Sequence, residues 1–257
     1  MATEEELAEV RPRLLGLIDE RRIRGVHISR PAPEIIARFL AFTDLGSTVS
    51  DALDSLGVGG AIPAHVLSPL APGQRVCGPA ITIRYVPRGG SAGAHYAAAH
   101  RPLLADRDLY AVGRPGDIAV FDAGGEASVS VMGGLSAMWA VRLEIGACIV
   151  DGGVRDIASV RTAGPAVWSR GRTPISGKHR MEAVEINGTV TIAGVQVRPG
   201  DLVAADDTGV CVVPAEDIEA VLEWGEAAER AEQAITSEIE AGVSVEEVKR
   251  RLRPERW

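Results

Sequence analysis

The chain is organised around a series of short apolar runs, each bounded by glycine, proline or acidic residues. These runs are far shorter than the roughly 20 apolar residues that cross a bilayer, so we expect no membrane span. Short apolar runs between turn residues are typical of buried β-strands. We expect strands at residues 76–85, 117–121, 147–150, 166–169, 184–186, 189–192, 202–204 and 210–213.

Segments with helical spacing of apolar residues lie before, between and after these runs. Residues 133–146 leave a glycine-rich corner and predict a helix between two strands, which makes a strand-helix-strand unit. The pattern therefore indicates an α/β fold. Further helices are expected at residues 3–24, where Pro12 can introduce a kink, at 33–40, from Ser47 to near Gly57, and at 215–252, the last as one long helix or two shorter ones.

Two local patterns give more specific predictions. Asn187-Gly188 tolerates the positive φ angles of a tight turn and predicts a hairpin between the runs on either side. Residues 114–122 resemble residues 198–206, because both contain Pro-Gly-Asp, a short strand and a final aspartate. The repeat is explained either by a common turn sequence or by two strands that deliver Asp122 and Asp206 to one rim of a sheet.

Composition restricts the environment and the partners of the chain. The 27 Lys and Arg residues are outnumbered by 35 Asp and Glu residues, and the formal charge of -8 argues against direct binding to nucleic acid. The acidic start, Met-Ala-Thr-Glu-Glu-Glu, is unlike a secretory signal, so we expect a cytoplasmic location. The cysteines lack metal-clamp spacing and are expected to be buried as small apolar residues: Cys77, Cys148 and Cys211.

Two glycine corners carry the residues best suited to chemistry. In the first, the strand at 147–150 continues through Asp151-Gly152-Gly153-Val154 to the adjacent residues Arg155 and Asp156. An arginine fork holds a carboxylate by two hydrogen bonds, and an aspartate offers a hard oxygen ligand for Mg²⁺. The alternative for this pair is an ordinary salt bridge or helix cap.

The second corner, Gly133-Gly134-Leu135-Ser136, opens the predicted helix, where free backbone N–H groups and the helix dipole favour an anion. Its alternative is plain close packing. Twenty residues separate Gly134 from Arg155, which leaves room for one helix and one strand. Both corners are therefore expected on one edge of a sheet, where α/β proteins bind ligands.

The stretch from Gly133 to Asp156, with its two glycine corners and the Arg155-Asp156 pair, resembles the RraA-like family, which includes 4-hydroxy-4-methyl-2-oxoglutarate aldolases. Weaker matches at residues 47–53, 75–82 and 206–214 extend the resemblance over about residues 45–220. It implies a swivelling β/β/α fold and a single domain over residues 1–257, with a helical N-terminal extension at 1–44 and a C-terminal helix at 215–252. It also implies a homotrimer, or a homohexamer made of two trimers, with active sites between subunits.

The resemblance also assigns roles. Asp156 corresponds to a divalent-metal ligand, and Arg155 to the residue that holds the carboxylate and keto oxygen of the substrate. The residues whose backbone amides bind that carboxylate are Gly133, Gly134, Leu135 and Ser136. In such aldolases Mg²⁺ or Mn²⁺ polarises the keto oxygen of a small 2-oxo acid and stabilises a pyruvate enolate, so no Schiff-base lysine is required. The chain has only two lysines, Lys178 and Lys249.

Two positions depart from the family pattern. Aldolases of this kind usually carry an acid at the position of Gly134, and many carry another one three residues after the metal-binding aspartate, where this chain has Ser159. The acid in the glycine corner helps to orient water for proton transfer, so the same reaction would need another base. Candidates are Asp122, Glu126 and Asp151.

The polar segment at residues 91–108 is either a substrate-specific flap or a surface loop, and it contains His95, Tyr96, His100, Arg101 and Asp106. Taken together, the sequence predicts a divalent-metal-dependent lyase for a small 2-oxo acid. The reaction is either retro-aldol cleavage of a 4-hydroxy-2-oxo acid or decarboxylation of an oxaloacetate-like acid. The alternatives are a non-catalytic regulator of a protein such as a ribonuclease, or a different metal-dependent reaction that follows from Gly134.

Overall fold

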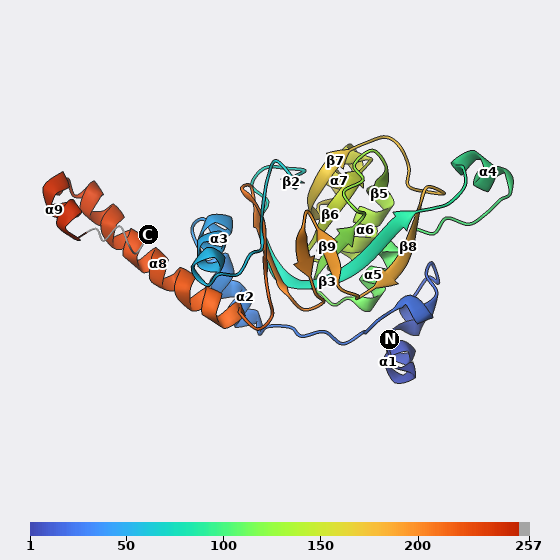
Figure 1. The fold of residues 1–257 in the computed structure, drawn as a ribbon, viewed down its shortest axis with the longest axis horizontal. Coiled ribbons are helices and arrows are strands. Elements are labelled where there is room, and N and C mark those ends of the chain that lie inside the picture. The colour runs from blue at the N-terminus through green and yellow to red at the C-terminus, as the bar shows by residue number, and fades with distance from the viewer. Residues whose placement is uncertain (252–257) are drawn as a thin grey trace.

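The computed structural model describes residues 1–251, which contain a ten-stranded mixed sheet (Figure 1). The strand order is β1-β12-β11-β3-β4-β6-β7-β2, with β5 paired to β6 and β8 paired to β3. These strands are β1 (Ala61–Pro63), β2 (Ser68–Pro69), β3 (Val76–Pro87), β4 (Ile118–Asp122), β5 (Ser130–Met132), β6 (Ala147–Val154), β7 (Ala166–Arg172), β8 (Met181–Ile186), β11 (Leu202–Asp206) and β12 (Gly209–Val213). A separate two-stranded sheet pairs β9 (Val190–Ile192) with β10 (Val195–Val197).

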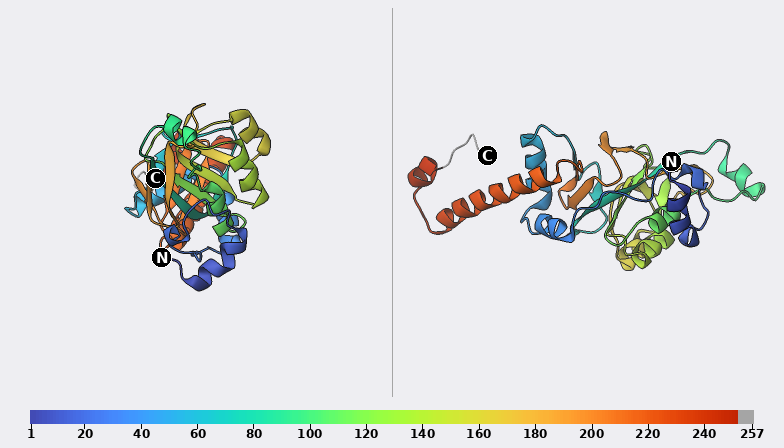
Figure 2. Two further views of the ribbon diagram at one scale, coloured as in Figure 1. Left: turned by 90° about the vertical axis from the view of Figure 1, so that its right-hand side faces the viewer. Right: turned by 90° about the horizontal axis from the view of Figure 1, so that it is seen from below.

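The described helices are α1 (Glu4–Val10), α2 (Pro33–Leu40), α3 (Leu45–Ser55), α4 (Ala92–Ala97), α5 (Asp106–Val112), α6 (Gly134–Arg142), α7 (Ile157–Ala163), α8 (Ile218–Glu240) and α9 (Val245–Arg251). α5, α6 and α7 lie on one face of the sheet, α2, α3 and α8 gather at one end of the molecule, and α4 projects at the opposite end (Figures 1 and 2). Two 3₁₀ turns, Arg11–Arg13 and Glu20–Arg22, follow α1. No helix in this part of the chain combines the length and the apolarity needed to span a bilayer.

Three layers form the body of the molecule. β3, β4, β6 and β7 run parallel, and α5, α6 and α7 connect them in turn. Leu109, Ala137 and Val160 of these helices pack on one face of the sheet. On the other face, Ile149 and Trp168 pack against β9, β10 and the curled β11–β12 hairpin. The β/β/α layering predicted from the family resemblance is therefore confirmed.

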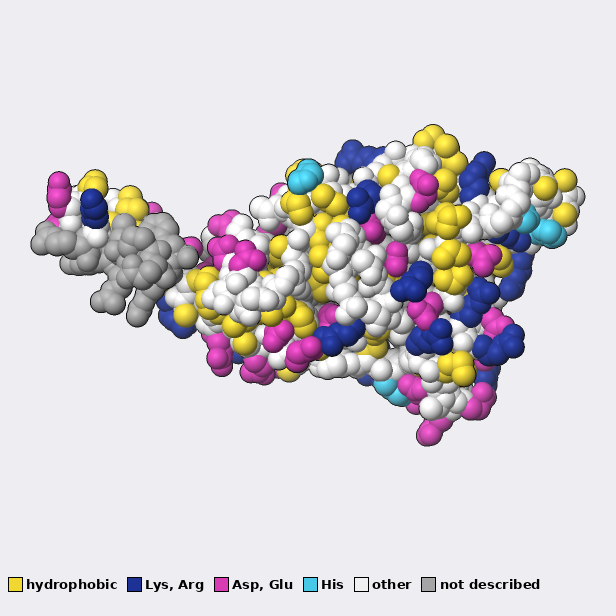
Figure 3. Space-filling view, viewed as in Figure 1, with side chains coloured by type: hydrophobic (Ala, Val, Ile, Leu, Met, Phe, Trp, Pro, Cys, Tyr) yellow, Lys and Arg dark blue, Asp and Glu magenta, His cyan; other side chains and the backbone are white. Residues whose placement is uncertain are grey.

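The helical end of the molecule has its own core. Phe39, Leu53, Leu222 and Val213 bring α2, α3 and α8 together against β11 and β12. The outer half of α8 and α9 extend away from this core (Figure 1). Acidic side chains are numerous over this end, whereas basic side chains gather over the body (Figure 3). For residues 215–252 the sequence predicted one long helix or two shorter ones. The structure has one long helix, α8, and one short helix, α9, up to residue 251, and residue 252 lies outside the described part.

The prediction of a helix over residues 3–24 is wrong. α1 ends at Val10, and Pro12, which has no N–H to donate, lies in the 3₁₀ turn that follows. Beyond this turn the Asp108 carboxylate accepts backbone N–H groups that a helix would have used internally. The donors, at 2.6, 2.5 and 3.1 Å, are Leu15, Leu17 and Ile18. A tertiary contact thus outcompetes the local helical pattern.

The predicted hairpin at Asn187-Gly188 is also wrong, because β8 pairs with β3 and β9 pairs with β10. The Asn187 side chain bridges separate segments: its Oδ1 accepts from the N–H of Thr82 at 3.1 Å, and its Nδ2 donates to the carbonyl of Gly25 at 3.0 Å. The tight turn of the small sheet lies at Ala193-Gly194, where φ is 48° and 86°.

The repeat at residues 114–122 and 198–206 is a turn, not a carboxylate rim. In each copy an aspartate, Asp117 or Asp201, accepts the N–H of the arginine three residues earlier, at 2.8 and 2.7 Å. β11 is antiparallel to β3, whereas β4 is parallel to β3. The final aspartates, Asp122 and Asp206, therefore lie at opposite ends of the sheet.

The prediction for the cysteines is confirmed. All three are buried and form no disulfide, and burial raises the pKa of each thiol to about 12: Cys77, Cys148 and Cys211. Such thiols are protonated at neutral pH and act as small apolar residues.

Candidate active site

β5 and β6 place the two glycine corners side by side. They pair in parallel, and the backbone N–H of Arg155 donates to the carbonyl of Met132, 3.1 Å away. α6 begins at Gly134, close after β5, and α7 begins directly after Asp156. The prediction that both corners lie on one edge of the sheet is therefore confirmed.

Asp156 presents one carboxylate oxygen to its surroundings. Its backbone is left-handed (φ 54°, ψ 42°), a conformation that aspartate tolerates better than most residues. Its Oδ2 accepts from the N–H of Gly134 at 3.2 Å and lies 3.3 Å from Nε of Arg155. No donor from the described residues reaches Oδ1, and the side chain is 42% exposed. Oδ1 is therefore available to a ligand.

Gly133 allows this close approach. A Cβ there would lie 2.8 Å from Oδ2 of Asp156 and 3.1 Å from Cγ of Arg155, so any side chain would push the pair away from α6. The backbone N–H groups of Leu135 and Ser136, in the first turn of this nine-residue helix, have no acceptor within residues 1–251. Together with the helix dipole they offer a site for an anion.

These groups line a cavity of about 140 Å³ at the edge of the sheet. Its charged residues are three cations, Arg107, Arg155 and Lys178, and two acids, Asp106 and Asp156. The structure thus brings together every residue that the sequence assigned to the site. The remaining lining consists of backbone and small or apolar side chains, with the hydroxyls of Ser130, Ser136 and Ser176.

Sequence reasoning did not assign Arg107, Lys178, Ser130 or Ser176 to this site. Arg107 comes from α5, and Lys178 comes from the loop between β7 and β8, so neither is near the glycine corners in sequence. Two features of the sequence could have pointed to these residues: the polar character of residues 91–108 for Arg107, and the scarcity of lysine for Lys178.

Asp106 is the most buried acid of the cavity. It is 3% exposed, and burial raises the pKa of its carboxyl, an effect that a hydrogen bond from the Ser136 hydroxyl partly offsets. Ser136 Oγ lies 2.9 Å from the hydroxyl of Tyr110, whose pKa is held well above its usual value by burial. Nε of Arg107 lies 3.9 Å from Oδ2 of Asp106.

The three acids predicted as candidate bases do not line this cavity. Asp151 is held by Nε of Arg170 at 2.5 Å and by the N–H of Ala193 at 2.9 Å. Asp122 accepts the N–H of Gly124 at 2.9 Å. Hydrogen bonds from Ser128 lower the pKa of Glu126. In each case the carboxylate closes a local turn or joins two layers.

Residues 91–108 divide into two parts. α4 extends away from the body (Figure 1), whereas Leu104, Asp106 and Arg107 line the cavity. Near α4, Nδ1 of His95 lies 2.8 Å from Nδ1 of His100. The outer part is thus a surface projection, and the inner part belongs to the site.

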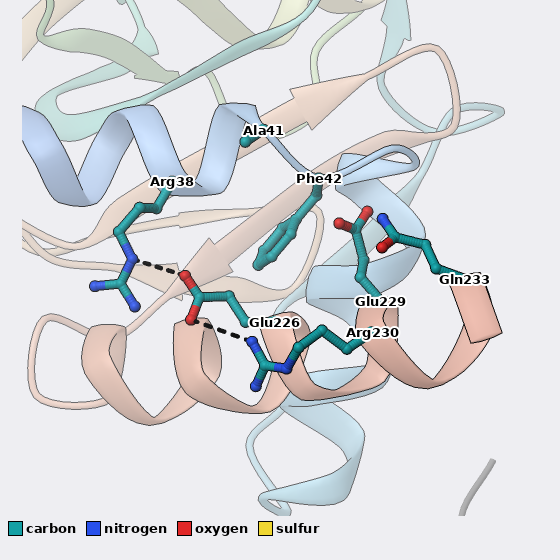
Figure 4. Close-up of a pocket in the computed structure, with 7 residues that line it drawn as sticks. All are labelled: Arg38, Ala41, Phe42, Glu226, Glu229, Arg230 and Gln233. Atoms are coloured by element: carbon teal, nitrogen blue, oxygen red, sulfur yellow. Dashed lines mark hydrogen bonds and ion pairs between the residues drawn. The ribbon is translucent and has the colours of Figure 1, made fainter.

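A second cavity, of about 270 Å³, lies between α2 and α8 at the helical end (Figure 4). Its charged groups pair with each other: Glu226 lies 2.7 Å from Nε of Arg38 and 4.0 Å from Nη1 of Arg230. The first contact joins α2 to α8 and the second lies within α8, and none of the predicted site residues lies here.

Comparisons with known proteins agree with this picture. The family model RraA-like, described as Aldolase/RraA, matches residues 46–212. Protein DlpA of Legionella pneumophila is 32% identical over 201 residues, which are 78% of this chain and 31% of that protein, so the match spans about a third of DlpA. A Halalkalibacterium halodurans protein named "Putative 4-hydroxy-4-methyl-2-oxoglutarate aldolase" is 31% identical over 175 residues, which are 68% of this chain and 75% of that protein.

Solved structures share the fold. An uncharacterized protein from Pseudomonas syringae pv. tomato superposes with a TM-score of 0.70 at 27% identity, over 85% of this chain and 98% of that one. A Streptomyces coelicolor protein, described as an unusual member of the RNase ES inhibitor RraA protein family, gives a TM-score of 0.65 at 25% identity, over 80% of this chain and 96% of that one. Because the family model spans well over half of its residues, this chain belongs to the RraA-like family.

Proposed function

We propose that the protein is a divalent-metal-dependent carbon–carbon lyase that cleaves a small 2-oxo acid. The observation that carries the proposal is the cavity between α6 and α7, where two free backbone N–H groups, the guanidinium of Arg155 and a free oxygen of Asp156 converge. A 2-oxo acid presents a carboxylate next to a keto oxygen, and these two groups match an anion site beside a cation and a metal ligand.

The first role is to bind and orient the substrate. The N–H groups of Leu135 and Ser136 donate to one carboxylate of the substrate at the positive end of α6. Arg155 uses Nε toward Asp156, and no acceptor in the described part of the chain takes its two terminal nitrogens. These nitrogens are placed to hold the substrate carboxylate and keto oxygen by a fork of hydrogen bonds.

The residues present fit Mg²⁺ or Mn²⁺. No group of three or more His, Cys, Asp or Glu side chains that could hold a metal ion occurs among the described residues, which disfavours a site closed by protein ligands alone. Mg²⁺ commonly keeps several waters and takes only one or two carboxylates together with the substrate, and Oδ1 of Asp156 supplies one such oxygen. Bound there, the ion would act as a Lewis acid toward the keto oxygen.

The other cavity charges favour an anionic substrate. Arg107 and Lys178 add two positive charges to that of Arg155. Both proposed substrate types, a 4-hydroxy-2-oxo acid and an oxaloacetate-like acid, carry at least one carboxylate. Their cleavage leaves the same three-carbon enolate, so one assay for pyruvate covers both.

We further propose that the active form is a homotrimer or homohexamer over residues 1–257 as one domain. α6 exposes three apolar side chains at intervals of three residues, Leu135, Met138 and Val141, which are 67%, 61% and 45% exposed. Because Leu135 also lines the cavity, a second copy seated on this face would shield the cavity from water. Light scattering after size-exclusion chromatography should give a trimer or hexamer, and an active monomer would contradict this part of the proposal.

The test of activity is pyruvate release from a panel of 4-hydroxy-2-oxo acids and from oxaloacetate, with Mg²⁺, with Mn²⁺ and with chelator. We expect metal-dependent turnover that falls on the order of 100-fold or more in Arg155→Ala. Arg142→Ala, at the exposed end of α6, is the matched control and should keep full activity. A further control tests whether Lys178, which lines the cavity, forms a Schiff base with the substrate. Borohydride added with pyruvate traps such an intermediate and inactivates the enzyme, so we expect the enzyme to stay active.

The metal site is tested separately by calorimetric titration of Mn²⁺ into the wild type and Asp156→Ala. We expect the variant to bind at least tenfold more weakly. Equal affinity would remove Asp156 from the metal site. Absence of turnover on every compound would instead favour the alternative, a regulator that binds a protein such as a ribonuclease, for which neither Asp156 nor a metal should matter.

A further inference from the structure

The two positions where this chain departs from the aldolase pattern are in contact with each other. A Cβ placed on Gly134 would lie 2.9 Å from Cβ of Ser159, a separation too short for two carbon atoms that are not bonded. The contact is with the first side-chain carbon of Ser159, which cannot rotate away. The corner therefore has no acid at either position and no room for one at Gly134 without a shift of α7.

The cavity has a second acid besides Asp156. Of its two lining carboxylates, Asp156 is the proposed metal ligand, which leaves Asp106. Asp106 reaches the same cavity from α5, on a different segment of the chain. A carboxyl group in this position can exchange a proton with a bound substrate without occupying the glycine corner.

The surroundings of Asp106 suit a group that both accepts and donates a proton. It is 3% exposed, and burial raises the pKa of its carboxyl toward the range in which general acids and bases work near neutral pH. The Ser136 hydroxyl donates to it when it is ionised. The other titratable groups that influence it or are influenced by it are Tyr85, Arg107, Asp108, Tyr110 and Cys148.

Arg107 keeps the ionised form accessible. Its Nε is buried without a hydrogen-bond partner and lies 3.9 Å from Oδ2 of Asp106, so a small movement would convert the contact into a hydrogen bond. A buried polar atom without a partner is uncommon in folded proteins. The orphaned Nε is thus close enough to donate a hydrogen bond to the ionised Asp106 carboxylate after a small movement.

We propose that Asp106 is the proton-transfer residue of this enzyme, in place of the acid that the glycine corner lacks. Its carboxylate takes the proton of the C4 hydroxyl as the C3–C4 bond of the substrate breaks and the C4 carbonyl forms. The bond electrons pass to the C2–C3 enolate, and Asp106 then returns the proton to C3 to give pyruvate. The assignment rests on the lyase function proposed above.

The experiment compares three reactions in the wild type, Asp106→Asn and Glu126→Gln with the metal bound. They are retro-aldol cleavage of a 4-hydroxy-2-oxo acid, exchange of the pyruvate methyl protons in D₂O followed by NMR, and decarboxylation of oxaloacetate. In Asp106→Asn we expect cleavage and exchange to fall by about 10²–10⁴-fold. Oxaloacetate decarboxylation should fall less than about tenfold, because no proton is removed before its bond breaks and water can protonate the enolate. Glu126→Gln, an acid outside the cavity, should match the wild type.

A second variant tests the same assignment without removing the carboxyl. Ser136→Ala removes a hydrogen bond that lowers the pKa of Asp106, so the acid limb of kcat/KM for cleavage should move to higher pH. Mn²⁺ titration and a thermal melt establish that the variants are folded and bind metal.

The outcomes separate this assignment from the proposed function. If the wild type cleaves and Asp106→Asn cleaves and exchanges within threefold of it, Asp106 is not the proton-transfer residue although the lyase function stands. An equal loss of all three reactions, with weaker metal binding, would assign Asp106 a structural role and overturn the proposal. If the wild type decarboxylates oxaloacetate but neither cleaves nor exchanges, the lyase function stands and the assignment of Asp106 is overturned. If the wild type shows none of the three reactions, the lyase function itself fails.

Discussion

Two aspartates, one inside β6 and one just after it, lie beside arginines, and their surroundings differ. Asp151, inside the strand, is 4% exposed, and its two carboxylate oxygens are taken by Arg170 and by the N–H of Ala193. Asp156, just beyond the strand, is 42% exposed, and only its Oδ2 has protein partners. Sequence alone gives both the same description, an aspartate at a glycine corner.

The difference separates acids that hold the fold together from acids that can act on a ligand. The Asp151 carboxylate joins β6, β7 and the turn between β9 and β10, so its charge is fully committed to the protein. Asp156 and Asp106 face a cavity, and each retains a group that a ligand can use. Position at the cavity, more than the presence of an arginine partner, distinguishes Asp156 and Asp106 from Asp151.

The largest effect on stability is expected at Asp151. Asp151→Ala leaves Arg170 without its partner and the N–H of Ala193 without an acceptor, and breaking a buried ion pair costs about 3–5 kcal/mol. Asp156→Ala should change the free energy of unfolding far less. Urea denaturation of both variants measures the comparison, and equal losses of stability would show that burial does not distinguish the two acids.

The next effect concerns the space at the glycine corner. Gly134→Asp forces a Cβ against Cβ of Ser159, so we expect a loss of about 1–3 kcal/mol, as for overpacked sites. Ser159→Gly removes that contact and should restore most of the loss in the double variant. If Gly134→Asp is as stable as the wild type, the corner has room for an acid, and the steric reason for using Asp106 disappears.

A smaller effect, of opposite sign, is expected at Asp106. Burial raises the pKa of Asp106 in the folded state, so the fold favours the protonated carboxyl. The free energy of unfolding therefore decreases as the pH rises from the ordinary pKa of an aspartate, about 4, through the raised pKa. Asp106→Asn removes the buried charge. Its Tm should therefore exceed that of the wild type by a few degrees at pH 8 and match it at pH 3. A variant that is less stable at pH 8 would contradict the assigned pKa shift.

Much of the fold follows from local pattern, and the departures arise from contacts distant in sequence. The predicted strands are present, and the helices at α2, α3 and α6 lie close to their predicted positions, because their apolar spacing is set within a few residues. The N-terminal helix fails because Asp108, more than 90 residues away, captures backbone N–H groups. The hairpin at Asn187 fails because β8 finds its partner in β3.

The candidate site shows the same division. The glycine corner and the Arg155-Asp156 pair were predictable because one strand-helix-strand unit holds both. Asp106, Arg107 and Lys178 enter from α5 and from the loop after β7, and their approach depends on how the layers pack. The raised pKa of Asp106 has burial as its largest cause, and no spacing in the sequence records that burial.

The smallest effect is expected at an acid outside the cavity. Glu126 closes a turn by accepting the N–H of Ser128 at 2.8 Å, and hydrogen bonds from the hydroxyl and the N–H of Ser128 lower its pKa. Glu126→Gln retains an acceptor, so stability should change by less than about 1 kcal/mol. A thermal melt checks this, and a large loss would place Glu126 with Asp151 among the acids that hold the fold together.

The left-handed backbone of Asp156 has a genetic consequence. Asparagine and glycine are the other residues that take this conformation with little strain. Aspartate codons reach codons for both by a single base change. Either replacement would preserve the turn between β6 and α7 while removing the negative charge of the carboxylate that faces the cavity. A lineage with this fold can therefore lose the proposed metal ligand at Asp156 in one mutational step while the backbone of the turn stays the same.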